Sequence, residues 1–278
     1  MAILLGMAAA ALSGAGDFFG GIASRLGRIT AVSIGAHAAG VVTALIVSPF
    51  ISGSPTTSDM LWGAAAGVSG GLAILALYRG FATGAIAVVS PIAAVGAGAW
   101  TVLFALATGD RPAAVQIVGL VVGLAAIWII STSPDQMGDR EQRPAGVGYG
   151  LLAGAGFGGL LIMLSAVGDG AGIWPLIPAR IAGGITLVAI AALAGSEIVP
   201  RAQSIAPLVT SGALTVLGNG AFILAANRGS LAVVSTLTAM FPAATVLLAR
   251  FVLGETLGPR RRTGLALALV AVALVASN

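Results

Sequence analysis

The chain has 278 residues, of which 58% are hydrophobic and only 8% are charged, and its mean hydropathy is +1.06. Soluble domains carry about 25% charged residues, so this composition excludes a soluble globular protein and indicates a polytopic membrane protein. The net charge of +4 comes from arginines that lie mostly near the ends of apolar segments, which indicates orientation in a membrane rather than nucleic-acid binding.

Ten segments are long and apolar enough to cross a bilayer, which needs about 20 such residues. We expect the first segment to be a retained span rather than a cleaved signal, because it lacks a basic leader and Asp17 interrupts it. One long polar linker, 133–145, divides the chain into residues 1–132 and 146–278, with five spans each. The predicted spans are about 2–24, 30–51, 60–80, 84–108, 112–131, 146–167, 173–195, 204–226, 230–253 and 261–277.

The two halves repeat one another at an offset of about 145 residues. Ala87-Val88-Val89-Ser90 recurs as Ala232-Val233-Val234-Ser235, and Gly109-Asp110 recurs as Gly254-Glu255. An odd number of spans in each repeat makes the second half enter the membrane upside down. We therefore predict an all-α membrane protein of ten transmembrane helices in two inverted five-helix repeats, with a substrate site near the midplane where the repeats meet.

Each half also carries a proline inside its fourth span, Pro91 in the first and Pro242 in the second. A proline in mid-helix removes a backbone hydrogen bond and kinks the helix, and membrane proteins tolerate this where neighbours satisfy the freed carbonyl. We interpret both prolines as hinges.

Few polar groups lie within the spans, and each is a candidate for function because a charge in hydrocarbon is costly. Asp17, beside Phe18, is a candidate for binding an amine or a proton, unless it lies at the interface and pairs with a nearby arginine. Arg180 is a candidate for binding a substrate carboxylate, unless it snorkels to the interface. His37 is a possible proton carrier or a packing histidine.

Aromatic and amide side chains add further candidates for a substrate cavity. Trp100 lies near the centre of the fourth span, away from the interfacial belt where membrane tryptophans normally occur. Such a ring is suited to stacking on a flat or cationic ligand, or to filling space against a neighbour. Tyr78 in the third span, Phe157 in the sixth and Asn219 in the eighth complete the predicted substrate-binding set.

The sequence argues against enzymatic chemistry. It holds no P-loop, nucleophile elbow or metalloprotease motif, so we expect no ATP hydrolysis. There is no cysteine and one histidine, which excludes a disulfide framework and a multi-histidine metal centre, and we predict no cofactor and no metal site. A membrane-embedded enzyme acting on a lipid head group and a non-transporting scaffold are weaker alternatives.

The duplicated five-helix unit and the hairpins Thr108-Gly109-Asp110-Arg111-Pro112 and Leu253-Gly254-Glu255-Thr256-Leu257 resemble the EamA branch of the drug/metabolite transporter superfamily. With its length and with Tyr78 and Trp100, the chain is similar to bacterial amino-acid exporters of the YddG type. The resemblance implies a multi-pass protein of the bacterial inner membrane that exports aromatic and other amino acids. The chain departs from many relatives in the first span, where Ser13-Gly14-Ala15-Gly16-Asp17 replaces a Trp-Gly pair.

These observations together predict a secondary transporter that exports amino acids by alternating access. Tyr78 and Trp100 would hold the side chain, Arg180 with Asn219 the carboxylate, and Asp17 the ammonium. Cationic drugs, nucleosides and sugars are the alternative substrates. The only plausible proton carriers are Asp17 and His37, and ten spans suffice for a monomeric transporter. Counting arginines places both termini outside the cytoplasm.

Overall fold

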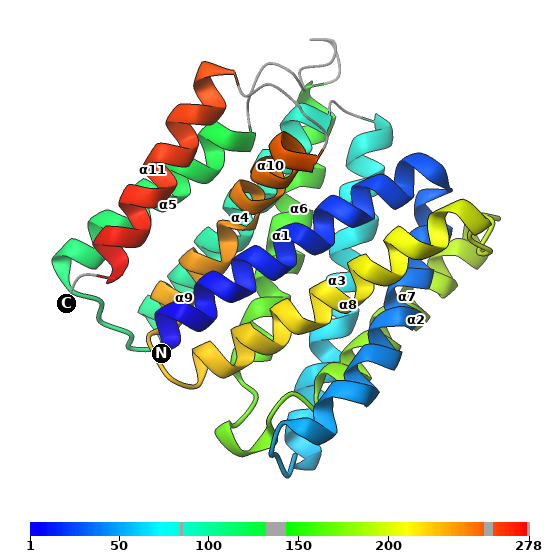
Figure 1. Cartoon of the computed structure of the whole chain (residues 1–278), viewed down its shortest axis with the longest axis horizontal. Helices are drawn as coiled ribbons and strands as arrows, with labels where there is room; N and C mark the ends of the chain where they lie inside the picture. The colour runs from blue at the N-terminus through cyan, green and yellow to red at the C-terminus, as the bar shows by residue number, and fades with distance from the viewer. Residues whose placement is uncertain (84–85, 132–142, 253–257, 277–278) are drawn as a thin grey trace.

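A computed structural model describes residues 1–83, 86–131, 143–252 and 258–276, and within these ranges the chain forms helices and no strand (Figure 1). Two short 3₁₀ helices, η1 (Ser48–Phe50) and η4 (Asp169–Ala171), precede α3 and α7. The longer helices are α1 (Ala2–Leu26), α2 (Ile29–Val47), α3 (Thr57–Thr83), α4 (Ile86–Ala107), α5 (Ala114–Ser131), α6 (Arg143–Ser165), α7 (Leu176–Leu193), α8 (Ala202–Ala226), α9 (Leu231–Ala239), α10 (Phe241–Val252) and α11 (Pro259–Ala276).

The all-helical membrane architecture predicted from the sequence is confirmed. Among the described residues, six helical stretches are long and apolar enough to span a bilayer on their own: Ala2–Leu26, Ile29–Phe50, Thr57–Leu77, Val147–Ser165, Leu176–Leu193 and Ala202–Ala226. The other predicted spans coincide with shorter apolar helices. The predicted 173–195 segment begins as turns, because η4 and Pro175 precede the first residue of α7.

The ninth predicted span, 230–253, is divided into α9 and α10 by a break at Met240. The residue two positions further on is Pro242, which has no N–H and therefore cannot donate to the carbonyl of Thr238. The chain tightens instead, since Met240 N–H donates to Leu237 O at 3.1 Å and Ala243 N–H donates to Met240 O at 2.9 Å. By contrast, α4 is continuous through Pro91.

Most helices form a ring in which neighbours come from opposite halves of the chain. The order around the ring is α1, α8, α2, α7, α3, α6, α4 and then α9 with α10. Helices α5 and α11 pack on each other beside this ring, at one side of the molecule in Figure 1. The contact of α1 with α8 has its counterpart in that of α6 with α3, and α2–α8 has its counterpart in α7–α3. The repetition seen in the sequence is therefore also a repetition of helix contacts.

Glycines bring the ring helices into backbone contact. Gly63 and Gly67 of α3 lie against the carbonyl groups of Pro175 and Ala179 at the start of α7, and Gly14 of α1 lies against the carbonyl of Phe241 in α10. Lipid offers no hydrophobic drive between helices, so close van der Waals packing through small residues holds such crossings together.

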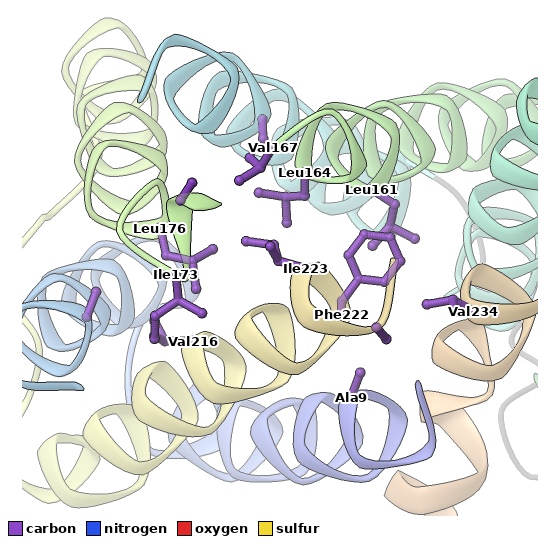
Figure 2. Packing of buried hydrophobic residues seen from close by; sticks show 14 residues of the cluster. Ala9, Leu161, Leu164, Val167, Ile173, Leu176, Val216, Phe222, Ile223 and Val234 are labelled. Atoms are coloured by element: carbon purple, nitrogen blue, oxygen red, sulfur yellow. The ribbon is translucent and has the colours of Figure 1, made fainter. Parts of the chain in front are cut away.

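A cluster of buried apolar side chains lies inside the ring, toward the end where α1 begins, and Figure 2 shows it from close by. We call this cluster the apolar plug. Phe222 and Ile223 of α8 meet Leu161 and Leu164 of α6, and every helix of the ring except α4 and α10 contributes. Its members are Ala9, Ala44, Ala66, Leu161, Leu164, Val167, Ala171, Ile173, Leu176, Val216, Phe222, Ile223, Ala225 and Val234.

Two carboxylates tie the halves of the chain together at the plugged end. Asp59, at the start of α3, accepts hydrogen bonds from Gly168 N at 2.8 Å and from Thr56 N at 2.8 Å. Asp110 accepts from Ser230 Oγ at 2.6 Å and from Ala232 N at 3.0 Å, and so binds the N-terminus of α9. A carboxylate at a helix N-terminus satisfies free N–H groups and complements the helix dipole.

The glycine–acid turn explains how Asp110 reaches α9. Gly109 has φ of 100°, which glycine adopts without strain, and the N–H of Asp110 donates to Ala105 O at 2.9 Å. This arrangement ends α4 with a Schellman-type cap and directs Asp110 away from its own helix. The matching turn at Gly254-Glu255 lies outside the described residues.

We expect Gly67→Ala to destabilise the protein by about 1–3 kcal/mol, because the added methyl group would overlap the carbonyl of Ala179 and push α3 from α7. Thermal unfolding in detergent should show a lower apparent Tm. Gly148→Ala is the matched control, since a methyl group on that exposed glycine meets nothing within 4 Å. Equal Tm values for the two variants would contradict the proposed packing.

We also expect Asp110→Ala to loosen the plugged end. The chain has no cysteine, so a single Val234→Cys substitution reports specifically on the plug, where Val234 is fully buried. Labelling of Val234→Cys by a water-soluble maleimide should be slow, and it should rise about tenfold or more when Asp110→Ala removes a charge-assisted hydrogen bond.

The control for that experiment is Asp169→Ala, which removes an exposed carboxylate from the same end. An unchanged labelling rate in the Asp110→Ala background would show that this carboxylate does not hold the end closed.

Candidate substrate site

The residues one helical turn inside the plug form a layer across the ring, which we call the site layer. Since side chains four residues apart share a helix face, one plug member on each of seven helices has a neighbour on the same face, one turn further into the ring. On α8 the two levels overlap, because the plug member Val216 lies three residues beyond Asn219. The site layer consists of Ser13, Gly40, Gly70, Phe157, Arg180, Asn219 and Thr238, which follow from Ala9, Ala44, Ala66, Leu161, Leu176, Ile223 and Val234. Three of the predicted site residues therefore lie at one level.

Arg180 is the charged member of the site layer. Its side chain lies across Gly40 of α2 and beside Val216 of α8, so three helices enclose it. Its Nη2 atom is buried and has no hydrogen-bond partner. An arginine carries five N–H donors, and a buried donor without an acceptor is costly. The arrangement is suited to an anionic oxygen ligand that would complete the hydrogen bonding.

Asn219 and Phe157 are half-buried in the same layer. Asn219 lies between Gly218, which packs against Ser13 of α1, and Gly220, which packs against Ile173. Phe157 lies between Gly156, which contacts Ala73 of α3, and Gly158, which contacts α4. An amide and an aromatic ring thus lie at the same level as the guanidinium group, carried by α8 and α6.

Asp17 lies one further turn away from the plug, beyond Ser13 on α1. The preceding residue Gly16 faces Thr215 of α8, and Gly14 faces α10. At 100° per residue, Asp17 points between these two neighbours and so toward the inside of the ring. Its side chain is nevertheless exposed, whereas the lipid-facing residue Leu4 lies on the far side of the helix. The inside of the ring is therefore open to solvent at this level.

His37 occupies a packing position between α2 and α7. Its Nδ1 atom lies 2.9 Å from Ser33 O, and the rest of the ring packs against Gly183. A groove of about 270 Å³ runs between α2 and α7 here, and it is lined by His37, by Arg180 and by the exposed side chains of Ile181 and Ile185. The Ser33 carbonyl is therefore the hydrogen-bond partner of Nδ1, and the opposite side of the ring is packed against Gly183 of α7.

Two predicted aromatic residues lie apart from the site layer. Phe18 is buried, and its ring meets that of Phe19 edge-on with centroids 5.4 Å apart. Trp100 is 52% exposed and lies on the α6 side of α4, against Gly158, near the exposed Leu103. The side chains of Tyr78, Pro91 and Pro242 lie outside the described part of the structure.

Sequence reasoning missed the hydroxyl groups of α9. Thr238 belongs to the site layer, and Ser235, one turn earlier on the same face, is fully buried. Neither stands out in the sequence, because serine and threonine are common in membrane helices and their burial depends on neighbours from the other half of the chain. In the described part of the chain, no group of three or more His, Cys, Asp or Glu side chains is placed to hold a metal ion.

Comparison with known proteins agrees with this architecture. Residues 144–277, slightly less than half of the chain, match the EamA-like transporter family. No curated protein matches the sequence. A crystal structure of another protein superposes with a TM-score of 0.80 over 99% of this chain and 96% of that one, at 14% identity. At this identity the likeness concerns the fold alone.

The family match concerns transporters, in agreement with the prediction that the protein is not an enzyme. The match begins at the start of α6 and ends at the end of α11, so it covers the helices from α6 to α11. The C-terminal half of this all-helical, multi-pass membrane protein is thus similar to the EamA-like transporter family.

Proposed function

We propose that the whole chain is an EamA-like secondary transporter that exports amino acids, aromatic and small ones, across the bacterial inner membrane by alternating access. The observation that carries this proposal is the buried, unpartnered Nη2 of Arg180 at the site layer, with Asn219 and Phe157 at the same level. The ring is complete within one chain, which supports a monomer as the transporting unit.

The arrangement of charges supports a zwitterionic substrate. Arg180 would bind the carboxylate, with the Asn219 amide as a second donor. Asp17 lies one turn further from the plug, on the opposite side of α8 from Arg180, and would bind the ammonium group. Phe157 offers an apolar face to the substrate side chain. Tyr78 and Trp100 remain candidates for contacts with larger side chains.

Alternating access would use the plug and the break in α9–α10. The plug closes one end while Asp17 is open to solvent from the inside of the ring. Opening the plugged end requires Asp59 and Asp110 to release their partners in the second half. A helix already interrupted at Met240 can change direction at low cost, which supports Pro242 as a hinge.

A cationic substrate is the second candidate, and Asp17 favours it. This residue is a carboxylate on the inner face of α1, and it is exposed there. A cationic drug would use Asp17 without needing Arg180. Competition between unlabelled amino acids and cationic compounds distinguishes the two candidates, and nucleosides and sugars serve as further competitors.

We expect proteoliposomes that contain only this protein to release preloaded tryptophan or threonine faster than empty liposomes. Arg180→Gln should lower kcat/KM for amino-acid efflux roughly 10- to 100-fold, because the carboxylate loses a charge-assisted hydrogen bond. The kcat/KM of Arg180→Lys should lie between that of the wild-type protein and that of Arg180→Gln.

The matched control is Arg228→Gln, since Arg228 is an arginine at the plugged end that donates to Leu224 O. No amino-acid flux above empty liposomes would refute the substrate assignment. Normal efflux by a folded Arg180→Gln protein would refute the role of Arg180.

We expect Asp17→Asn to abolish any stimulation of efflux by a pH gradient, because asparagine has no carboxylate to protonate. Amino-acid counterflow should persist with a raised KM, because the asparagine oxygen still accepts from the ammonium group but carries no charge. Parallel measurements of gradient-driven efflux and counterflow test this. His37→Gln is the control, because His37 packs between α2 and α7. Retained pH coupling in the Asp17→Asn protein would exclude this residue as the proton carrier.

A further inference from the structure

Helix α9 carries buried hydroxyl groups that lack hydrogen-bond partners. Every residue from Ala232 to Met240 is buried, and the hydroxyl oxygens of Ser235, Thr236 and Thr238 have no partner. The hydroxyls of Thr43, Thr101 and Thr186 behave differently, since each donates to the carbonyl four residues earlier. Outside α9, the described residues hold one other buried hydroxyl without a partner, that of Ser48 in η1. Leaving a buried hydroxyl unsatisfied is costly, so this helix is expected to hold a ligand or ordered water.

Two of the three hydroxyls share one face of the helix. Ser235 and Thr238 are three residues apart and therefore lie on the same side. Leu237 faces Gly6 of α1, and Ala239 faces Gly98 of α4. The Ser235–Thr238 face consequently points between these helices, toward the inside of the ring. Thr236 lies on another side, where its methyl group meets Gly123 of α5.

Backbone oxygens at the break add to this face. The carbonyl of Thr238 has no α-helical donor, because the fourth residue after it is Pro242, and it accepts instead from the N–H of Met240 two residues on. The last carbonyls of a helix carry a partial negative charge. Thr101 of α4 lies near the same level, since Gly98 meets Ala239 and Val102 packs with Leu237. Its hydroxyl donates to Ala97 O at 2.8 Å and keeps its lone pairs free to accept.

We propose that this face of α9 binds Na⁺ through the Ser235 and Thr238 hydroxyls and the carbonyl oxygens at the Met240 break. The donor set consists of neutral oxygens, which suits a hard cation. A single positive charge fits, because no carboxylate lies in the set to balance a second one. Unwound backbone at the end of a half-helix is a recurrent way of coordinating Na⁺ in transporters with inverted repeats.

Sodium-dependent stability of the purified full-length protein tests the site without any substrate. Thermal unfolding in detergent is measured in NaCl and in choline chloride at equal ionic strength. We expect the apparent Tm to be higher by about 3 °C or more at saturating Na⁺. Binding of ²²Na⁺ to the same preparation should saturate at one ion per chain.

Three variants complete the test. Thr238→Val should abolish the Na⁺-dependent rise while leaving the Tm in choline chloride unchanged or higher, because the hydroxyl it removes has no partner. Thr238→Ser should retain the rise. Thr236→Val is the matched control on the same helix and should also retain it.

Equal Tm values in Na⁺ and choline would overturn the proposal, as would a Na⁺ response that survives in both Thr238→Val and Ser235→Ala. Neither measurement involves amino acids or Arg180. A negative result would therefore refute the Na⁺ site without affecting the transport proposal, which the efflux experiment tests separately.

Discussion

The close approach of helix backbones at glycine is the constraint on which the rest of the structure depends. In lipid, helices gain little from burying leucine, so dispersion and short polar contacts must hold the ring together. Gly63 and Gly67 of α3 let α7 come within backbone contact, and Ser69 Oγ then donates to Gly156 O of α6 at 2.8 Å. Because these crossings are tight, the position of each helix sets the level of every residue that it carries.

The plug and the site layer illustrate this dependence. The plug is apolar and buried, and pulling it apart in water would cost about 25 cal/mol for each Å² of apolar surface exposed. One turn above it, the same helix faces carry Arg180, Asn219 and Thr238, whose polar groups need partners. On α1, α7 and α9 the same helix face changes from apolar to polar within one turn, whereas on α8 the plug residue Val216 lies beyond Asn219 and beside Arg180.

Much of this fold follows from the sequence, and less of the site does. Ten spans, five in each half, can be read from apolar segment lengths, and the Gly109-Asp110 turn marks the end of α4. Pro242 predicts the break at Met240, whereas α4 is continuous through Pro91. A proline interrupts a helix or leaves it continuous depending on whether neighbouring groups satisfy the backbone carbonyl that it frees. Arg180 was identified because a charge in an apolar span is costly. The positions of Phe18 and Trp100 could not be predicted, because helix rotation is set by crossings with the other half of the chain. The burial of the α9 hydroxyls could not be predicted either, because it also depends on contacts with the other half of the chain.

The alternation of halves around the ring also bears on how the protein is made. Almost every extensive helix contact joins one half to the other, as α1 does with α8, α3 with α6 and α7, and α5 with α11. A ribosome delivers the first five spans before any of these partners exists. During that interval the glycine faces of α1 and α3 must lie against lipid, and α5 must wait for the last helix of the chain. We therefore expect assembly of this protein to be completed late in synthesis, because neither half holds its principal helix contacts by itself.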